Sequence, residues 1–391
     1  MRSAVVAPVV LALLPLCAAG EPRVFDFRPR GNAAGAPAYS ANGFGFEAPS
    51  DTRFSIDVPE GNYRVTVRFG ASRMAESLNI FAEQRRLVSE GLALARRKSV
   101  ERQFIVNVRT PWLGDLRANA PGGQLVRLKT REIGSANWDG KLTLEFSAHP
   151  AALETVSIEP VDLPTLYLTG DSTVTDQPVP PNASWGQRVP ALFAPDIAVA
   201  NHAESGETLK SFVTEQRLDK MLSGLRTGDW VMIQFGHNDQ KTQWPQTYVD
   251  AATTYRSWLR TYVAEIRGRG ATPLLVTSPE RRNFDASGHI VPTLGDYPQA
   301  MRSVAREERV GLIDLNAMSI RVYEALGPQV APRAFAENGN DKTHFDEYGA
   351  DLLARCVVEG LRGAGEYSAG LEKHLVTGLS HFDPDHPELP P

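Results

Sequence analysis

The chain has 391 residues, which is more than one compact core normally holds, so at about 150 residues per domain we expect two folding units. Hydrophobic residues make up 42% and charged residues 22% of the chain, ordinary globular values that exclude a disordered or fibrous protein. The formal net charge is −5, so the composition gives no electrostatic case for binding nucleic acid.

The first twenty residues are typical of an export signal. Arg2 precedes an apolar run over residues 4–16, and small residues follow that run. The run is shorter than the ~20 residues that cross a bilayer, so cleavage is favoured over a membrane anchor. Lipid attachment at Cys17 is a lesser alternative, because Leu16 stands where a small residue is normally needed. We expect residues 1–20 to be a signal peptide and the protein to be secreted or periplasmic, in a bacterium, with no membrane span.

Removal of that signal would leave Cys356 as the only cysteine, so no internal disulfide is expected. Cys356 lies within an apolar helical pattern and is predicted to be buried and inert.

Residues 21–160 are predicted to form an antiparallel β-sandwich. Apolar and polar residues alternate over residues 54–58 and 63–69, and turn-forming residues 59–62 between them predict a hairpin. The same alternation recurs at residues 104–108, 124–128 and 142–146.

From residue 164 onward, short apolar strands alternate with helices, the signature of a parallel sheet with helices on both faces. The expected strands are residues 166–168, 197–200, 231–235, 274–276 and 312–315. The expected helices include residues 209–222, 248–266 and 348–361. Five strands fit a flavodoxin-like, three-layer α/β/α domain over residues 164–370, with residues 371–391 as a C-terminal tail.

Sites in such sheets gather at the carboxyl ends of the strands, so the loop after each strand is informative. Gly170-Asp171-Ser172 follows the first strand. The glycine allows a sharp turn, and a serine at the start of the next helix would expose its hydroxyl for nucleophilic attack. Taken alone, however, this tripeptide is more typical of a helix cap.

The loops after the second and third strands supply candidate oxyanion donors. Gly206 precedes a helix, where unpaired backbone N–H groups can face developing negative charge. Asn238 follows the third strand, and its side-chain amide is a fixed donor that is not consumed by the reaction. The alternatives are an ordinary strand-to-helix loop at Gly206 and an Asx turn at Asn238.

Residues 341–344, Asp-Lys-Thr-His, precede the last helix. This spacing can bring the Asp341 carboxylate to the imidazole of His344, which would hold its tautomer and make it a base. The alternatives are an exposed capping pair or two metal ligands, for which only His237 and Asp239 are evident supplements.

Each motif is weak alone, but the four in this order are unlikely to coincide by chance. Together they assemble a nucleophile, two or three oxyanion donors and an oriented base. The chain contains no Gly-x-Ser-x-Gly, which excludes an ordinary α/β-hydrolase elbow.

From about residue 166 to residue 363, these segments resemble the SGNH (GDSL-like) hydrolase superfamily. Within them, Gly170-Asp-Ser-Thr, Trp185-Gly-Gln, residues 233–239 and residues 341–344 look most like the rhamnogalacturonan acetylesterases. The resemblance implies a serine carbohydrate esterase that needs no cofactor and removes O-acetyl groups from rhamnogalacturonan in plant cell-wall pectin.

The resemblance also assigns roles. It makes Ser172 the nucleophile and His344 the base, oriented by Asp341, and it builds the oxyanion hole from the N–H groups of Ser172 and Gly206 with Nδ2 of Asn238. Three alternatives stay open: an esterase acting on another acetylated glycan such as xylan, one acting on a lipid or thioester, and a noncatalytic glycan-binding protein.

The expected partner is an acetylated polysaccharide or oligosaccharide. Trp185, Trp244 and Tyr248 lie near the cleft loops and could either stack on sugar rings or belong to the core. Arg85 and Arg86 could meet uronate carboxylates, although solvated surface charge is favoured for them. Three segments, Phe25-Asp-Phe27, Gly43-Phe-Gly-Phe-Glu47 and Gly61-Asn-Tyr-Arg-Val65, resemble galactose-binding-like or malectin-like sandwiches. Such domains either bind sugar or only pack against the catalytic domain.

Overall fold

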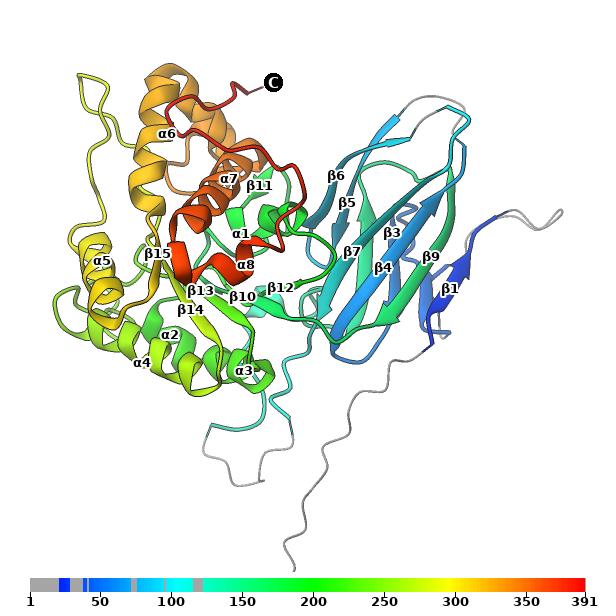
Figure 1. Ribbon diagram of the computed structural model, residues 1–391, viewed down its shortest axis with the longest axis horizontal. Coiled ribbons are helices and arrows are strands. Elements are labelled where there is room, and N and C mark those ends of the chain that lie inside the picture. Colours follow the sequence, from blue (N-terminus) through cyan, green and yellow to red (C-terminus); the bar gives the residue numbers. More distant parts are fainter. Residues whose placement is uncertain are drawn as a thin grey trace, which may run out of the picture.

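The structure is a computed structural model, and it describes residues 21–28, 38–40, 42–71, 76–94, 96–114 and 122–390 (Figure 1). The predicted signal peptide lies outside the described residues. Two antiparallel sheets precede one parallel sheet. We call the antiparallel part, which ends at Pro160, the β-domain, and the part that begins at Thr165 the α/β-domain.

The β-domain is a sandwich, since residues from both of its sheets share one apolar core that includes Phe54, Val65 and Leu144. One sheet has the order β1-β9-β4-β7 and the other β2-β3-β8-β5-β6. The first sheet contains β1 (Arg23–Asp26), β4 (Gly61–Phe69), β7 (Val100–Val108) and β9 (Leu153–Pro160). The second contains β2 (Phe44–Phe46), β3 (Arg53–Asp57), β5 (Glu76–Ala82), β6 (Arg86–Leu94) and β8 (Lys141–Phe146).

Two details of the predicted sandwich are wrong. β3 and β4 do not form a hairpin, because β3 pairs with β2 and β8 whereas β4 pairs with β7 and β9 in the opposite sheet. Alternation reveals which residues face the core but not which strand lies alongside. Residues 124–128 form no strand, only a single bridge between Leu125 and Trp112. Val126 of this segment packs with Leu113 and Trp138, and the backbone of Arg127 binds Glu215 of the α/β-domain.

The parallel sheet has the order β12-β10-β13-β14-β15, and the first strand of the domain lies between the second and the third. Numbered within the domain, that order is 2-1-3-4-5, which confirms the flavodoxin-like prediction. Its strands are β10 (Thr165–Gly170), β12 (Ala198–Asn201), β13 (Trp230–Gln234), β14 (Thr272–Val276) and β15 (Gly311–Ile313). The helices are α1 (Trp185–Arg188), α2 (Leu209–Thr214), α3 (Arg217–Gly224), α4 (Thr254–Gly268), α5 (Tyr297–Glu308), α6 (Leu315–Val330), α7 (Glu347–Gly363) and α8 (Ala369–Glu372).

Helices cover both faces of this sheet (Figure 1). Leu168 and Met232 face a core that includes α6 and α7, whereas Tyr167 and Val231 face a core that includes α2 to α5. Neighbouring strand residues therefore serve opposite faces, as a sheet buried on both sides requires. Cys356 of α7 is a fully buried free thiol, as predicted, and burial raises its pKa.

Element boundaries differ from the sequence prediction at three places. The expected helix 248–266 begins only at Thr254, the first residue of α4. The expected helix 209–222 is broken, because Gln216 has a left-handed backbone with a φ of 62° between α2 and α3. Apolar periodicity continues across the break and could not reveal it. Leu315 begins α6 rather than ending β15, since Asp314 caps that helix by accepting from the backbone N–H of Ala317.

Charged groups join the two domains. The Arg86 guanidinium donates to Asp176 Oδ2 at 2.9 Å, and the side chains of both residues are at most 2% exposed. Arg85 donates to Glu347 Oε1 at 2.6 Å. The prediction of solvated charge at Arg85 and Arg86 is therefore wrong, because contacts between distant segments cannot be read from local sequence.

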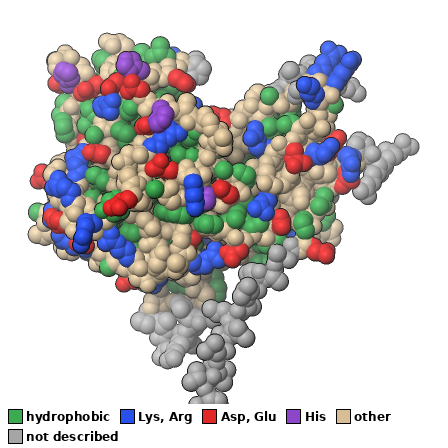
Figure 2. All heavy atoms as spheres, in the orientation of Figure 1, with side chains coloured by type: hydrophobic (Ala, Val, Ile, Leu, Met, Phe, Trp, Pro, Cys, Tyr) green, Lys and Arg blue, Asp and Glu red, His purple; other side chains and the backbone are tan. Residues whose placement is uncertain are grey.

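On the face drawn in Figure 2, positive and negative side chains are interspersed over both domains. No helix among the described residues is long and apolar enough to cross a membrane.

We expect Arg86→Ala to lower the free energy of unfolding by about 3–5 kcal/mol, because it strands a buried carboxylate at Asp176. Urea unfolding measures the loss. Arg64→Ala is the control, since Arg64 and Glu159 form an ion pair with both side chains about a third exposed, and its loss should be below about 1 kcal/mol. Equal losses in the two variants would contradict a buried interdomain ion pair.

Candidate active site

The strand order places three candidate loops side by side. β10 pairs with β12 on one side and with β13 on the other, with Leu168 opposite Asn201 and Gly170 opposite Gln234. The loops that follow these parallel strands therefore leave the same edge of the sheet, with the Ser172 loop in the middle. The topology brings the Gly206 and Asn238 loops to the two flanks of that loop.

The turn that carries Ser172 requires glycine at its start. A Cβ on Gly170 would lie 2.5 Å from Cγ2 of Val174 and 2.8 Å from the backbone oxygen of Gln234. The close approach lets the chain reverse at once after β10, so that Ser172 stands at the edge of the sheet.

A buried hydrogen-bond chain holds this turn from below. Trp185 Nε1 donates to Gln234 Oε1 at 2.7 Å, and Gln234 Nε2 donates to Thr173 Oγ1 at 2.7 Å. Thr173 Oγ1 in turn donates to Asp171 Oδ1 at 2.9 Å. Each member is almost completely buried, so the positions on both sides of Ser172 are fixed.

Ser172, His344 and Asp341 meet in one line of hydrogen bonds. Ser172 Oγ lies 2.8 Å from His344 Nε2, and His344 Nδ1 lies 2.7 Å from Asp341 Oδ2. The side chain of His344 is 40% exposed, so the imidazole can be reached from solvent. A hydroxyl, an imidazole and a carboxylate in this order can generate an alkoxide nucleophile and move its proton.

The Asp341 carboxylate is set up to stay ionised. Burial raises its pKa. Hydrogen bonds from the N–H and imidazole of His344 and from the N–H of Thr343 lower the pKa by more than burial raises it, so the net pKa lies below the ordinary value. Those two N–H groups donate to Oδ1, which leaves Oδ2 for the imidazole. The carboxylate therefore orients the ring and stabilises its protonated form.

His344 is placed by contacts that lie outside the parallel sheet. β16 (Phe345–Asp346) pairs with β11 (Asn182–Ala183), a ribbon that ties the residue after His344 to the segment downstream of Ser172. From the loop after β14, the Arg282 guanidinium donates to the backbone oxygen of Asp341 at 3.3 Å. Sequence reasoning missed Arg282, which carries no motif of its own.

Two backbone N–H groups beside Ser172 are free to donate. Within the described part of the chain, neither Ser172 N nor Gly206 N has a hydrogen-bond acceptor. Gly206 has a φ of 84°, the left-handed region that favours glycine, so the turn presents its N–H in a conformation other residues rarely adopt. Free N–H groups of this kind can stabilise an oxyanion.

The Asn238 side chain is held in one orientation. Its Nδ2 donates to the backbone oxygen of Glu207 at 3.1 Å, and its Oδ1 accepts from Lys241 Nζ at 2.7 Å. Because an ammonium can only donate, Lys241 fixes which end of the amide is oxygen. One hydrogen on Nδ2 remains for a further acceptor.

His237 and Asp239 serve as internal supports. His237 Nε2 lies 2.7 Å from the backbone oxygen of Pro279 and so donates to it, while its Nδ1 lies 3.7 Å from Asp171 Oδ2. Asp239 accepts from the N–H of Leu209 at 2.9 Å and anchors the start of α2, and burial raises its pKa to about 7. Over the described ranges, no three His, Cys, Asp or Glu side chains are grouped so that they could hold a metal ion.

The aromatic candidates separate clearly. Trp185 is fully buried and belongs to the hydrogen-bond chain beneath Ser172, so it cannot stack on a sugar. Trp244 is 44% exposed, and the Lys241 ammonium lies 4.5 Å from its ring centroid. Tyr248 is half-buried and lies near Asp250. Of these three residues, only Trp244 presents a large apolar face to solvent.

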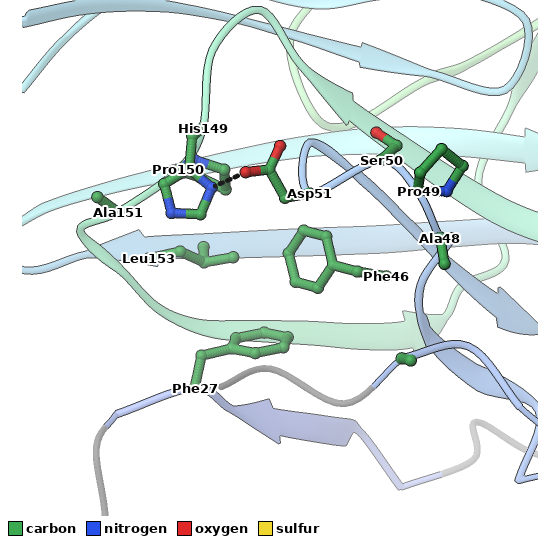
Figure 3. A pocket seen from close by; sticks show the side chains of 11 residues that line it. Phe27, Phe46, Ala48, Pro49, Ser50, Asp51, His149, Pro150, Ala151 and Leu153 are labelled. Atoms are coloured by element: carbon green, nitrogen blue, oxygen red, sulfur yellow. Dashed lines mark ion pairs between the residues drawn. The ribbon is translucent and has the colours of Figure 1, made fainter. Parts of the chain in front are cut away.

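A separate cavity of about 390 Å³ lies in the β-domain. Figure 3 shows the rings of Phe27 and Phe46 on one side of it and the ion pair between Asp51 and His149 on another. The lining is mainly apolar, and both members of that ion pair are largely exposed to solvent. None of the predicted site residues lines this cavity.

Comparison with known proteins identifies the family of this chain. The sequence profile of the GDSL-like lipase/acylhydrolase family matches residues 168–352, a range that includes all five predicted site residues. The chain is 41% identical over 225 residues to rhamnogalacturonan acetylesterase RhgT of Bacillus subtilis, a match that covers 54% of this chain and 94% of the relative. It is 36% identical over 203 residues to the probable rhamnogalacturonan acetylesterase YesY of the same organism, covering 51% of this chain and 93% of the relative.

A crystal structure of the Bacillus subtilis protein YxiM has a similar fold, with a TM-score of 0.50 and 24% identity over 89% of each chain. That similarity extends beyond the α/β-domain and concerns the fold alone. The family profile and the identity to RhgT are independent of it. The chain therefore belongs to the GDSL-like lipase/acylhydrolase family, the SGNH hydrolases, and is a serine esterase.

Proposed function

We propose that this protein removes acetyl groups from a plant cell-wall polysaccharide through an acyl-enzyme on Ser172. The hydrogen-bond chain from Ser172 through His344 to Asp341 carries the proposal. His344 Nε2 takes the proton of Ser172 as its oxygen attacks the ester carbonyl, and then gives that proton to the departing sugar oxygen. Water, activated by the same imidazole, next attacks the acetyl-enzyme and releases acetate and free Ser172.

The negative charge that develops on the carbonyl oxygen needs donors that are already in place. The N–H groups of Ser172 and Gly206 and the remaining hydrogen on Asn238 Nδ2 are the donors we assign to this oxyanion hole. Two observations support this assignment: the two N–H groups have no acceptor among the described residues, and the Asn238 amide is held in one orientation. Preorganised donors act without the cost of reorganisation during the reaction.

For the substrate we propose acetylated rhamnogalacturonan. The names of the relatives RhgT and YesY support this choice. So do Lys241 and Arg281, half-buried cations that form no salt bridge with a carboxylate of the described residues; the Arg281 guanidinium donates instead to Thr293 Oγ1 and to the backbone oxygen of His237. Burial lowers the pKa of both side chains. Glu280 and then Asp171 attract the Arg281 guanidinium, whereas the Lys241 ammonium is repelled by Arg281 and attracted by Asp171. Cations left unpaired beside the site suit a polymer that carries uronate carboxylates.

We also propose that the protein acts outside the cytoplasm. The support is the sequence pattern of residues 1–20, a short apolar run after Arg2 followed by small residues. A polymeric cell-wall substrate would be met in that compartment.

Ser172→Ala should abolish acetate release from a small acetyl ester and from acetylated rhamnogalacturonan, because no other group supplies the attacking oxygen. Acetate is measured enzymatically at equal protein concentrations. Ser287→Ala, at an exposed serine, is the matched control and should keep wild-type activity. Acetate release that survives in Ser172→Ala would sink the assignment of the nucleophile.

Asn238→Ala should lower kcat by ~10²–10³, since one preformed oxyanion donor contributes roughly 3–4 kcal/mol to transition-state stabilisation. Steady-state kinetics on a small acetyl ester measures the change, and circular dichroism verifies the fold. A decrease of less than about threefold is incompatible with Asn238 as an oxyanion donor.

Arg281→Met should raise KM for acetylated rhamnogalacturonan by about tenfold, the effect of losing one hydrogen bond to a charged group. On a neutral acetyl ester and on acetylated xylan, kcat/KM should stay within about threefold. Arg306→Met, at an exposed arginine of α5, is the control. A uniform loss on all three substrates, or a preference of the wild type for xylan, would refute the uronate contact.

A further inference from the structure

A segment of the β-domain lies against the loop that contains Gly206. The backbone N–H of Arg127 donates to the backbone oxygen of Glu215 at 3.0 Å, which joins the segment to the α/β-domain. Directly after it, residues Thr130–Glu132 form a short 3-10 helix. The chain thus delivers Lys129 and Arg131 to the loop after β12, although these residues precede that loop by more than seventy positions.

Both side chains bind the same backbone carbonyl. Lys129 Nζ donates to the oxygen of Ser205 at 2.7 Å, and Arg131 NH2 donates to that oxygen at 2.6 Å. Each cation also contacts a carboxylate that flanks the turn: Lys129 pairs with Glu207, and Arg131 Nε donates to Glu204 Oε1 at 2.8 Å. The Ser205 carbonyl is therefore held by two positive charges from the other domain.

The peptide unit that links Ser205 to Gly206 explains why this contact concerns catalysis. A trans peptide is planar, so its C=O and N–H point in opposite directions. Two donors that hold the Ser205 oxygen therefore fix the opposite direction of the Gly206 N–H, the group assigned to the oxyanion hole. Hydrogen bonds to a carbonyl also polarise the amide and strengthen its N–H as a donor.

The same loop positions the second donor. Glu207, whose carboxylate is fully buried, pairs with Lys129, and its backbone oxygen accepts from Nδ2 of Asn238 at 3.1 Å. A shift of this residue would move the Asn238 amide together with Gly206. The two oxyanion donors that are not part of the Ser172 turn thus depend on one loop.

The segment that bears the two cations is itself rigidly held. Glu132 is buried and accepts from the guanidinium of Arg217 at 2.9 Å and from the N–H of Lys129 at 2.9 Å. Trp138 Nε1 donates to the same carboxylate at 3.0 Å. Because Glu132 is fixed from both domains, Lys129 and Arg131 have little freedom to retreat from the loop.

We propose that Lys129 and Arg131 are positioning residues of the oxyanion hole, so that the β-domain completes the active site of the α/β-domain. This inference rests on the proposed acyl-transfer function. It assigns the β-domain a part in catalysis that is independent of sugar binding.

Arg131→Ala and Lys129→Met should each lower kcat on a small acetyl ester by about tenfold, and the double variant by about a hundredfold, while KM changes by less than threefold. We expect kcat to change more than KM because the Gly206 N–H binds mainly the transition state. Lys129→Arg, which keeps a donor, should retain kcat within about threefold. Arg127→Ala is the matched control, an exposed side chain in the same segment, and should keep full activity.

The rate at which a methylphosphonate ester modifies Ser172, followed by mass spectrometry, is the second readout, because that reaction also places a charged oxygen in the hole. It should fall in parallel with kcat. The Arg131 side chain is 57% exposed, so Arg131→Ala is expected to fold even where Lys129→Met does not, and urea unfolding verifies this.

Folded variants that keep kcat and the phosphonylation rate within twofold of wild type would overturn the proposal, as would a rise in KM alone. If the wild type is phosphonylated at Ser172 but releases no acetate, the proposed esterase function fails. The phosphonylation rates of the variants then still decide the role of Lys129 and Arg131.

Discussion

The hydrogen bond between Ser172 Oγ and His344 Nε2, 2.8 Å long, joins groups 172 positions apart in the chain, and the site depends on it. Each partner is also held by contacts of its own. A buried chain from Trp185 fixes the Ser172 turn, while the ribbon of β11 and β16 holds the segment after His344. A geometry that must be accurate to a few tenths of an ångström is thus set by contacts on both sides, which meet at residues 182–185, so the proposed nucleophile and base are oriented before substrate arrives.

Charged side chains lie on both sides of this hydrogen bond, and they act differently on each side. On the side of the base, Asp341 stays ionised because backbone N–H groups and the imidazole bind it. Lys129 and Arg131 bind the backbone carbonyl of Ser205 rather than the reacting atoms. In the proposed oxyanion hole they would therefore reinforce a neutral donor without adding a charge that substrate must displace. Lys241 has two roles. Its ammonium orients the Asn238 amide, and it is also one of the two cations that form no salt bridge with a carboxylate.

The two domains are coupled through buried ions rather than through an apolar seam alone. Arg86 with Asp176 on one side and Arg217 with Glu132 on the other place charges where water is excluded. Such pairs contribute little net stability but penalise any misaligned docking, because a displaced partner leaves a buried charge unpaired. The relative position of the two domains matters because Lys129 and Arg131 of the β-domain bind the loop that contains Gly206.

The sequence by itself determined the chemistry and the order of elements. The informative features are local: the glycine before Ser172, the three-residue spacing between Asp341 and His344, and the apolar patterns of strands and helices. Local sterics and hydrogen bonding suffice to interpret them. Only the tertiary structure decided which strands pair, where Arg86 lies and which carbonyl Lys129 binds. Those contacts join segments far apart in the chain, and their energies depend on burial and on distance, which a side-chain pattern does not encode.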